Sequence, residues 1–319
     1  MPHHASITMT KGVKSKKPVR EVKKLSLKYQ GIAQTTRKRY EAQLKIFFHY
    51  LSLRDVPLPS TWRRLDRLVA DYIDHMFQEG APVGYAGDLL SGLSRWMPGS
   101  RNNMPTARLW FRDWCRDVVR KRALPIPVFA LNGLAGIALA MDRLDLAVLL
   151  PVGFVCMLRT CEIYSLKKED IMFNPSGKTA IIALQQTKTS GPNTEEAVVY
   201  DQCLVNGLRR LCSQTSAGKP LYSRPAKFLG EDLRWLGSLV GFSHNRFTPY
   251  SLRRGGATWH MHTYGSLSTT ALLGRWKQER TAKIYIDGAA AEWASWQFDE
   301  KAQALLKSSS KIFRKTLAR

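Results

Sequence analysis

A short proline-containing segment, Leu124-Pro125-Ile126-Pro127, restricts the folding of this chain more than any other feature of its sequence. Proline fixes φ, lacks a backbone N–H and pushes the preceding residue toward extended conformations, so a Pro-x-Pro segment ends any helix that reaches it. The chain of 319 residues is also longer than one average domain requires. We therefore expect two domains, residues 31–123 and 128–319, joined by a linker at residues 124–127.

The part before the linker has the apolar periodicity of helices. Five apolar residues recur at i, i+4, i+7, i+8 and i+11 after a candidate N-cap at Thr35, namely Tyr40, Leu44, Phe47, Phe48 and Leu51. Similar patterns over residues 64–79, 85–97 and 106–122, separated by prolines, predict three further helices. Lys and Arg crowd the predicted helix ends, with tryptophans between them. This composition fits either a solvated polar surface or a helical bundle that faces DNA.

The part after the linker has a mixed pattern. Apolar stretches predict helices over residues 128–141 and 143–157, and a β-like region follows with strands over 170–173, 179–185 and around 197–200. Helical patterns return from about residue 201 to the end. The fold class we expect is therefore mainly α with a small β-sheet.

The charge balance indicates a polyanionic partner. Lys and Arg number 49 against 25 Asp and Glu, which gives a net charge of +24. Each phosphate that a protein neutralises releases condensed counterions, so a surplus of this size favours nucleic acid. Ribosomal and membrane-surface proteins can also be this basic. Residues 1–30 are polar and aperiodic, and we expect them to form a flexible basic tail without a secretory signal.

Neither a metal nor another cofactor is expected, and neither is a membrane span. The five cysteines show no CxxC spacing, which favours reduced, buried thiols in an intracellular protein. His260 and His262 stand at i, i+2, whereas two helical metal ligands need i, i+4. The longest apolar stretch, residues 146–158, is too short to cross a bilayer.

Four local signals in the second half carry candidate chemistry, although each has an ordinary explanation. Arg159 followed by Glu162 fits a structural ion pair, and Lys188 fits a polar hairpin. Pro249 begins a predicted helix whose first turns carry Arg253, a natural clamp for phosphate. The fourth signal is Leu272-Leu273-Gly274-Arg275-Trp276, followed by Tyr285, and aromatic residues near a C-terminus are more often core residues than catalytic ones.

The order and spacing of these signals closely resemble the active-site series of the tyrosine recombinases. Residues 158–166 match the family pattern Leu-Arg-x-x-Glu-x-x-x-Leu, and Tyr250-x-x-Arg253 with Ala257-Thr258 matches the second arginine motif. Trp276 stands nine residues before Tyr285, as the family pattern requires. These motif sequences are most similar to those of recombinases from eukaryotic mobile elements. The resemblance covers nearly all of residues 33–290, and it implies a core-binding helical bundle followed by an α+β catalytic domain.

The resemblance also implies a role for each matched residue. Tyr285 would be the nucleophile that forms a 3′-phosphotyrosyl bond, and Lys188 would protonate the leaving oxygen. The remaining matched residues would bind or orient the phosphate, with Glu162 holding Arg159: Arg159, Glu162, Tyr250, Arg253 and Trp276. The partner would be double-stranded DNA, bound by a homotetramer on paired sites. In a eukaryote the protein would act in the nucleus.

Two departures leave alternatives open. Tyr250 stands where the family usually has histidine, and Arg275 rather than Trp276 could fill the third motif position. A weakened enzyme or a non-catalytic DNA-binding relative therefore stays an alternative. A type IB topoisomerase is another alternative, because it shares the Arg, Lys and Tyr chemistry. The apolar side of the C-terminal stretch is expected to dock on a neighbouring subunit through Trp293, Trp296, Phe298, Ala302, Leu305 and Leu306.

Binding to duplex DNA is expected to weaken steeply with salt, because phosphate contacts would dominate it. A plot of log K against log salt concentration should fall with a slope of about 0.9 per neutralised phosphate, and several phosphates should be involved. Fluorescence anisotropy with a labelled duplex measures this slope. A flat salt response would contradict the assignment of the basic surplus to DNA.

Overall fold

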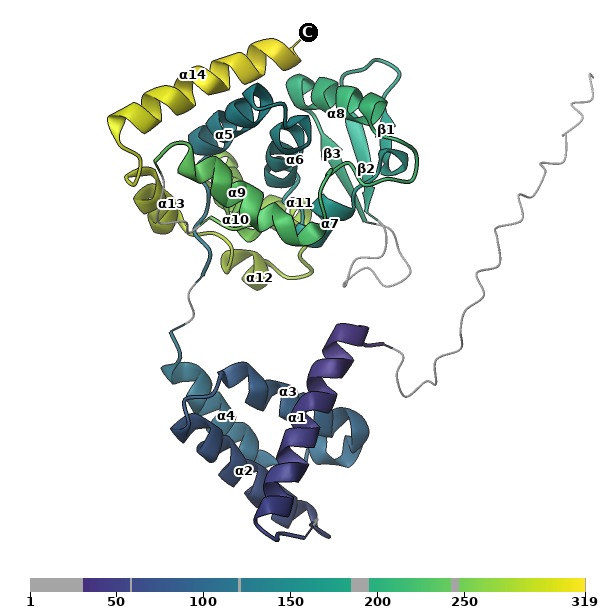
Figure 1. Cartoon of the computed structure of the whole chain (residues 1–319), viewed down its shortest axis with the longest axis vertical. Helices are drawn as coiled ribbons and strands as arrows, with labels where there is room; N and C mark the ends of the chain where they lie inside the picture. The colour runs from purple at the N-terminus through teal and green to yellow at the C-terminus, as the bar shows by residue number, and fades with distance from the viewer. Residues whose placement is uncertain (1–30, 58, 120–121, 185–194, 242–246, 319) are drawn as a thin grey trace, which may run out of the picture. The chain divides into compact units, whose positions relative to one another are not determined.

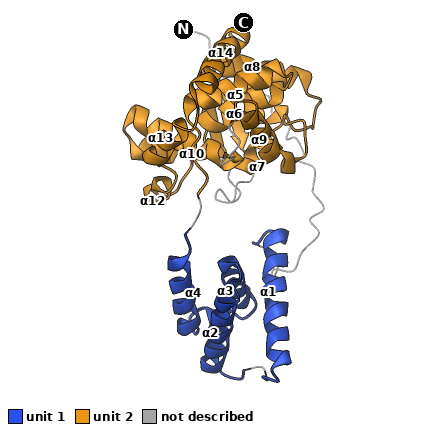
Figure 2. Cartoon of the chain, turned by 60° about the vertical axis from the view of Figure 1, so that its left-hand side comes forward, with its two compact units in different colours: residues 1–120 blue, residues 121–319 orange. Residues whose placement is uncertain are grey.

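A computed structural model describes residues 31–57, 59–119, 122–184, 195–241 and 247–318. The chain divides into two compact units, residues 1–120 and 121–319, which Figure 2 colours separately. The basic tail expected over residues 1–30 lies outside the described residues, and so does Lys188. No helix within these ranges is long and apolar enough to cross a membrane.

The first unit is a helical bundle (Figure 1). Its elements are α1 (Gln34–Leu53), α2 (Trp62–Gln78), α3 (Val83–Trp96), a 3₁₀ turn (Pro98–Arg101) and α4 (Pro105–Asp117). These four helices confirm the predicted ones, although α4 ends at Asp117 rather than near residue 122. Phe47 and Leu51 enter the core, whereas Phe48 is 39% exposed, contrary to the predicted face.

Two buried carboxylates fix the helices of the first unit. Asp66 on α2 accepts hydrogen bonds from the backbone N–H groups of Thr106 and Ala107 at 3.1 and 2.9 Å, which caps the start of α4. Asp88 on α3 binds the guanidinium of Arg39 on α1 through both oxygens, at 2.6 and 2.8 Å. Polar contacts therefore link α1 to α3 and α2 to α4, in addition to the apolar packing of these helices.

The second unit is mainly helical with one small sheet. Its helices are α5 (Val128–Ala140), α6 (Leu144–Val155), α7 (Thr160–Ser165), α8 (Gln202–Gln214), α9 (Leu229–Ser238), α10 (Pro249–Tyr264), α11 (Leu267–Leu273), α12 (Glu279–Lys283), α13 (Gly288–Ser295) and α14 (Glu300–Leu317), with 3₁₀ turns at Lys168–Asp170 and Ala226–Phe228. Its strands are β1 (Ile171–Phe173), β2 (Ala180–Leu184) and β3 (Glu195–Val199). The predicted fold class, mainly α with a small sheet, is confirmed.

The sheet is antiparallel, in the order β1-β2-β3. Its register pairs Ile171 with Ile182 and Ile182 with Ala197. Burial alternates along β2, so Ala180, Ile182 and Leu184 face the core, as the period of two in a strand requires. This pairing places Glu195, the first residue of β3, opposite the end of β2 and beside the start of α7.

The C-terminal helix α14 packs on α5 of its own unit, whereas docking of the C-terminal stretch on a neighbouring subunit stays a prediction. Gly133 and Gly136 on α5 carry no side chain, so the backbone of α14 at Leu306 and Ser309 comes close. Ala302, Leu306 and Phe313 of α14 are buried, and so is Leu317, which lies beside Gly207 of α8. Trp296 and Leu305 remain exposed.

A second close approach involves α10 and the proline-containing segment. A Cβ on Gly255 would collide with the carbonyl oxygen of Ile126, and one on Gly256 would collide with that of Phe154 on α6. Ile126 is 1% exposed, and its N–H donates to the carbonyl of Ser251 on α10 at 3.3 Å. The second half of the expected linker, at Ile126, therefore packs onto α10.

The cysteines differ from expectation. Cys156 is buried, but Cys161 is exposed and Cys115, Cys203 and Cys212 are half-buried. All five thiols are free, as expected. The apolar neighbours of Cys161 in the sequence misled the prediction, because the short helix α7 turns this position to solvent while Ile163 faces the core.

Gly136→Ala is expected to destabilise the second unit. Alanine favours a helix over glycine by about 1 kcal/mol, but here its Cβ would meet the backbone of α14, and overpacking costs about 1–3 kcal/mol. Gly230→Ala in α9 is the matched control, because its Cβ would meet only Pro249 at an ordinary 3.7 Å. Urea denaturation measures both, and a Gly136→Ala protein as stable as wild type would contradict the close packing.

Candidate active site

The first candidate pair lies where α6 ends and α7 begins. Met157 has a left-handed backbone with φ of 46°, a conformation that costs about 1–2 kcal/mol in a residue with a Cβ. This turn directs Arg159 back toward Glu162. The carboxylate of Glu162 accepts hydrogen bonds from the Arg159 backbone N–H at 2.7 Å and from Arg159 Nη1 at 2.5 Å. The predicted ion pair is therefore present, and it also caps α7.

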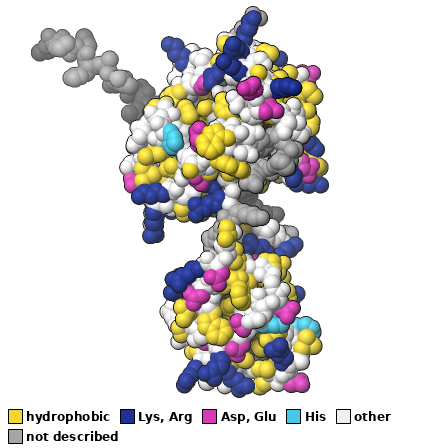
Figure 3. Space-filling view, turned by 90° about the vertical axis from the view of Figure 1, so that its left-hand side faces the viewer, with side chains coloured by type: hydrophobic (Ala, Val, Ile, Leu, Met, Phe, Trp, Pro, Cys, Tyr) yellow, Lys and Arg dark blue, Asp and Glu magenta, His cyan; other side chains and the backbone are white. Residues whose placement is uncertain are grey.

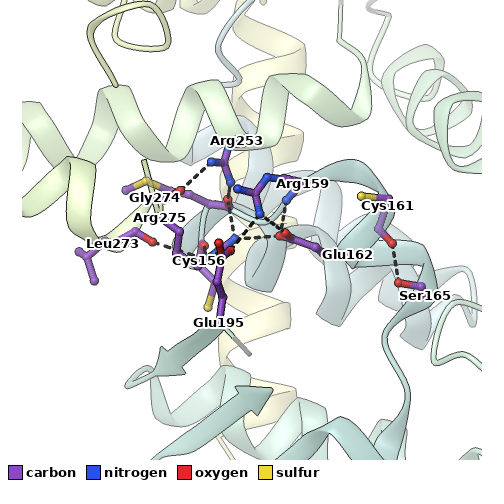
Figure 4. Close-up of polar contacts among 11 residues, drawn as sticks. Cys156, Arg159, Cys161, Glu162, Ser165, Glu195, Arg253, Leu273, Gly274 and Arg275 are labelled. Carbon is purple, nitrogen blue, oxygen red and sulfur yellow. Dashed lines mark hydrogen bonds and ion pairs between the residues drawn. The ribbon is translucent and has the colours of Figure 1, made fainter. Parts of the chain in front are cut away.

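A second arginine, Arg275, reaches the same carboxylate from the segment after α11 (Figure 4). Its Nη2 donates to Glu162 at 2.8 Å, and its Nε lies 3.3 Å from a carboxylate oxygen of Glu195. Glu195 also binds Arg159 Nη1 at 3.1 Å. Arg275 has a φ of 57°, the second left-handed residue of the site. Two carboxylates thus bridge two guanidinium groups from different parts of the chain.

Arg253 on α10 completes a cluster of three arginines. It is 2% exposed, and its Nη1 and Nη2 donate to the carbonyl oxygens of Met157 and Gly274, the latter at 2.6 Å. Its Nε has no hydrogen-bond partner among the described residues. Carbonyl oxygens hold this guanidinium without neutralising it, so its positive charge is not matched by a carboxylate of its own.

Two aromatic rings pack against Arg253, and a third ring packs against one of them. The guanidinium carbon lies 4.4 Å from the ring centroid of Trp276 and 5.4 Å from that of Tyr285. The Trp276 and Tyr285 centroids are 4.6 Å apart, and those of Tyr250 and Tyr285 are 5.4 Å apart. Tyr285 follows α12, and its N–H donates to Ala282 at 2.9 Å. The phenol proposed as nucleophile therefore lies beside the phosphate-binding candidate Arg253.

Burial and like charge both act on the protonation of this site. Burial, followed by the charges of Arg275 and Arg159, lowers the pKa of Arg253 to about 10. The guanidinium is still charged at neutral pH, but its charge is disfavoured, and a nearby anion would favour it again. Burial, followed by a hydrogen bond with Tyr285, raises the pKa of Tyr250 above its ordinary value. Tyr250 is therefore a neutral phenol at neutral pH.

The structure brings six of the seven predicted site residues together, from four separate segments. They are Arg159, Glu162, Tyr250, Arg253, Trp276 and Tyr285. Lys188 lies outside the described residues. The two candidates for the third motif position, Trp276 and Arg275, occupy different places. Trp276 packs on Tyr285, while Arg275 binds Glu162 and Glu195.

Sequence reasoning missed Glu195. A glutamate at the start of a strand is common, and nothing in its neighbourhood pairs it with residues more than 30 positions away. Its position seven residues after Lys188, on the strand next in the chain, is the only signal that could have indicated it.

Two other features of the unit bear on cofactors. His260 is buried, and its Nδ1 lies 2.8 Å from the hydroxyl oxygen of Thr270. Burial lowers the pKa of this histidine. Within the described ranges, no three His, Cys, Asp or Glu side chains gather in a way that could hold a metal ion.

Known structures share this architecture at low sequence identity. The Tn1549 transposon integrase (residues 82–397) in complex with circular intermediate DNA is 12% identical, with a TM-score of 0.58, over 84% of this chain and 95% of that one. The lambda integrase (75–356) dimer bound to a COC′ core site is 15% identical, with a TM-score of 0.54, over 84% and 93%. The XerH site-specific recombinase bound to difH is 14% identical, with a TM-score of 0.53, over 81% and 78%.

The chain has the tyrosine recombinase fold. No family model and no curated protein matches its sequence. The resemblance recognised from the ordered motifs is thus confirmed for the fold, by structures whose sequences share only 12–15% identity with this chain.

A tetrahedral oxyanion is expected to stabilise the protein through Arg253. Sulfate should raise the thermal midpoint more than chloride does at equal ionic strength, because an anion that binds only the folded state stabilises it by about 2.7 kcal/mol at 100 times its Kd. Arg253→Gln should lose this specific rise, leaving only the general effect of sulfate. Exposed Arg280→Gln is the control and should respond as wild type does. Equal responses of all three proteins in differential scanning calorimetry would exclude an anion site at Arg253.

Proposed function

We propose that this chain cleaves and rejoins DNA strands through a 3′-phosphotyrosyl intermediate, as an integrase or site-specific recombinase of a mobile element. One observation carries the proposal. A tyrosine, a tryptophan and a buried cluster of arginines, predicted from motifs far apart in the sequence, meet at one point of a tyrosine recombinase fold.

The arginines fit the electrostatic demand of the reaction. Attack on a phosphodiester adds negative charge to a group that is already anionic, so the transition state needs donors that are in place beforehand. Arg253 and Arg159 are planar forks that can grip a phosphate at two oxygens. Backbone carbonyls hold the Arg253 guanidinium, and carboxylates hold that of Arg159. Three guanidinium groups face two carboxylates in this cluster, which leaves positive charge for the phosphate.

Tyr285 would perform the covalent step. Its phenolic oxygen attacks the scissile phosphorus and forms an O–P bond, while the bond from phosphorus to the 5′ oxygen breaks. The phenolic proton is released to water, and the departing 5′ oxygen takes a proton, for which Lys188 is the candidate donor. Rejoining reverses these steps, and because the bond energy is retained in the phosphotyrosyl link, neither ATP nor a metal is required.

The remaining residues would support this step. Glu162 holds Arg159 and Arg275 in place. Trp276 packs on both Arg253 and Tyr285, and its indole N–H can donate to a phosphate oxygen. Tyr250 can donate a hydrogen bond as a neutral phenol. The raised pKa keeps Tyr250 protonated at neutral pH, so this residue has no basic site to take up a proton there, unlike the histidine usual at this position.

The basic composition supports double-stranded DNA as the partner. Lys and Arg side chains form several groups on the face drawn in Figure 3, and these groups occur on both units. We assign the first unit to DNA binding and the second to catalysis. A homotetramer on paired DNA sites follows from the proposed recombination, with docking surfaces other than the buried face of α14.

Tyr285→Phe is expected to abolish the covalent adduct while leaving DNA affinity and stability near wild type, because only one oxygen is removed. The assay is a nicked suicide substrate taken from DNA that flanks the gene, followed by denaturing electrophoresis. Tyr264→Phe at the end of α10 is the matched control, since this exposed tyrosine packs on Trp259 and His260 rather than in the site.

An adduct formed by Tyr285→Phe would show that another residue is the nucleophile. Failure of the wild type on every such substrate would favour the non-catalytic alternative. Relaxation of arbitrary supercoiled plasmid by the wild type would instead favour the topoisomerase alternative.

A further inference from the structure

Arg254, the neighbour of Arg253 on α10, is buried in a separate polar contact. Consecutive residues of a helix point about 100° apart, so Arg254 does not share the partners of Arg253. It is 2% exposed. Its Nη1 donates to the carbonyl oxygen of Ala123 at 2.9 Å, and its Nη2 donates to Asp287 Oδ2 at 3.1 Å. The guanidinium of Arg254 therefore joins Ala123, just before Pro125, to Asp287, two residues after Tyr285.

Asp287 fixes the chain that carries Tyr285. It stands two residues after the tyrosine and caps α13, where its Oδ1 accepts the N–H of Ala290 at 3.0 Å. Its own N–H donates to the hydroxyl of Thr258 on α10 at 3.1 Å. That hydroxyl in turn donates to the carbonyl oxygen of Tyr285 at 3.4 Å. The backbone on the C-terminal side of Tyr285 is thus tied to α10 by two side chains, Thr258 and Arg254.

The burial of Arg254 makes this tie costly to release. A buried guanidinium that loses its carboxylate keeps an uncompensated charge, and breaking such a pair is far more unfavourable than losing a surface ion pair. Asp287 is the carboxylate that binds Arg254 among the described residues. Because the buried Arg254 of α10 needs Asp287 as its carboxylate partner, the segment after Tyr285 is held in one position.

We propose that Arg254 is a positioning residue, which acts through Asp287 to hold Tyr285 in line with the phosphate and ties that segment to Ala123, near the start of the second unit. This inference rests on the proposed strand-cleavage function. Arg254 does not touch the reacting atoms, and it differs from Arg253 in this respect. Its loss misplaces the nucleophile without removing phosphate-binding groups.

The test uses the full chain with Asp287→Asn and Arg254→Gln. Asparagine caps a helix about as well as aspartate, so Asp287→Asn keeps the cap of α13 and removes only the charge that binds Arg254. Asp201→Asn is the matched control, because Asp201 also caps a helix, α8, and also binds an arginine, Arg314. Single-turnover cleavage at saturating DNA, DNA affinity and amide hydrogen exchange are measured for each protein.

Asp287→Asn and Arg254→Gln are expected to slow single-turnover cleavage by about 10- to 100-fold, as misplacement of a reacting group does, with unchanged DNA affinity. Exchange should accelerate at the amide of residue 287 in both variants, and at the amide of Ile126 in Arg254→Gln. Arg254→Lys should restore part of the rate. Asp201→Asn should cleave as wild type does.

Cleavage by Asp287→Asn at the wild-type rate would overturn the inference, and so would a loss no greater than that of Asp201→Asn or one explained by weaker DNA binding. A wild type that forms no adduct would instead reject the proposed function. In that case the exchange data alone test whether Arg254 holds the segment after Tyr285. Unchanged exchange in Asp287→Asn would show that Arg254 does not hold it.

Discussion

Two consecutive buried arginines on α10 impose the constraint on which the second unit depends. A buried charge without polar partners is strongly unfavourable, and Arg253 and Arg254 point in different directions, so each needs partners of its own. The carbonyls of Met157 and Gly274 serve Arg253, whereas Asp287 and the carbonyl of Ala123 serve Arg254. The end of α6, the segment before Trp276 and the segment after Tyr285 must all lie against α10 to provide them. Satisfying two guanidinium groups therefore assembles the site.

The choice of partners decides what the site can bind. Carboxylates neutralise a guanidinium, while carbonyls only orient it, and Arg253 has carbonyls. Its lowered pKa has the same origin, because burial and the neighbouring arginines disfavour a charge that has no local counterion. Glu162 and Glu195 restrain the other arginines and keep the cluster from excessive repulsion. An oxyanion arriving at Arg253 would meet fixed donors, and little reorganisation would be needed as charge develops.

Local patterns in the sequence predicted much of this structure, and long-range contacts account for the remainder. Helix periodicity located the helices, and the spacing from Arg159 to Glu162 predicted an ion pair, because residues three apart meet at a helix start. The position of Glu195 depends on the return of β3, and the inward turn of Arg275 depends on a left-handed backbone that no short pattern indicates. The packing of α14 on its own unit depends on Gly133 and Gly136, which look ordinary in a helix rich in small residues.

The glycines that follow the arginine pair connect packing with chemistry. Gly255 and Gly256 let α10 approach the carbonyls of Ile126 and Phe154 more closely than any residue with a Cβ would. This approach buries the helix face next to Arg253, where a lower effective dielectric makes each hydrogen bond and each charge act more strongly than in water. A larger residue at either glycine would therefore weaken the site by admitting water and shifting α10, although neither glycine contacts a reacting group. The motif Arg253-Arg254-Gly255-Gly256 is one physical unit, in which the arginines supply charge and the glycines supply the close packing that makes the charge effective.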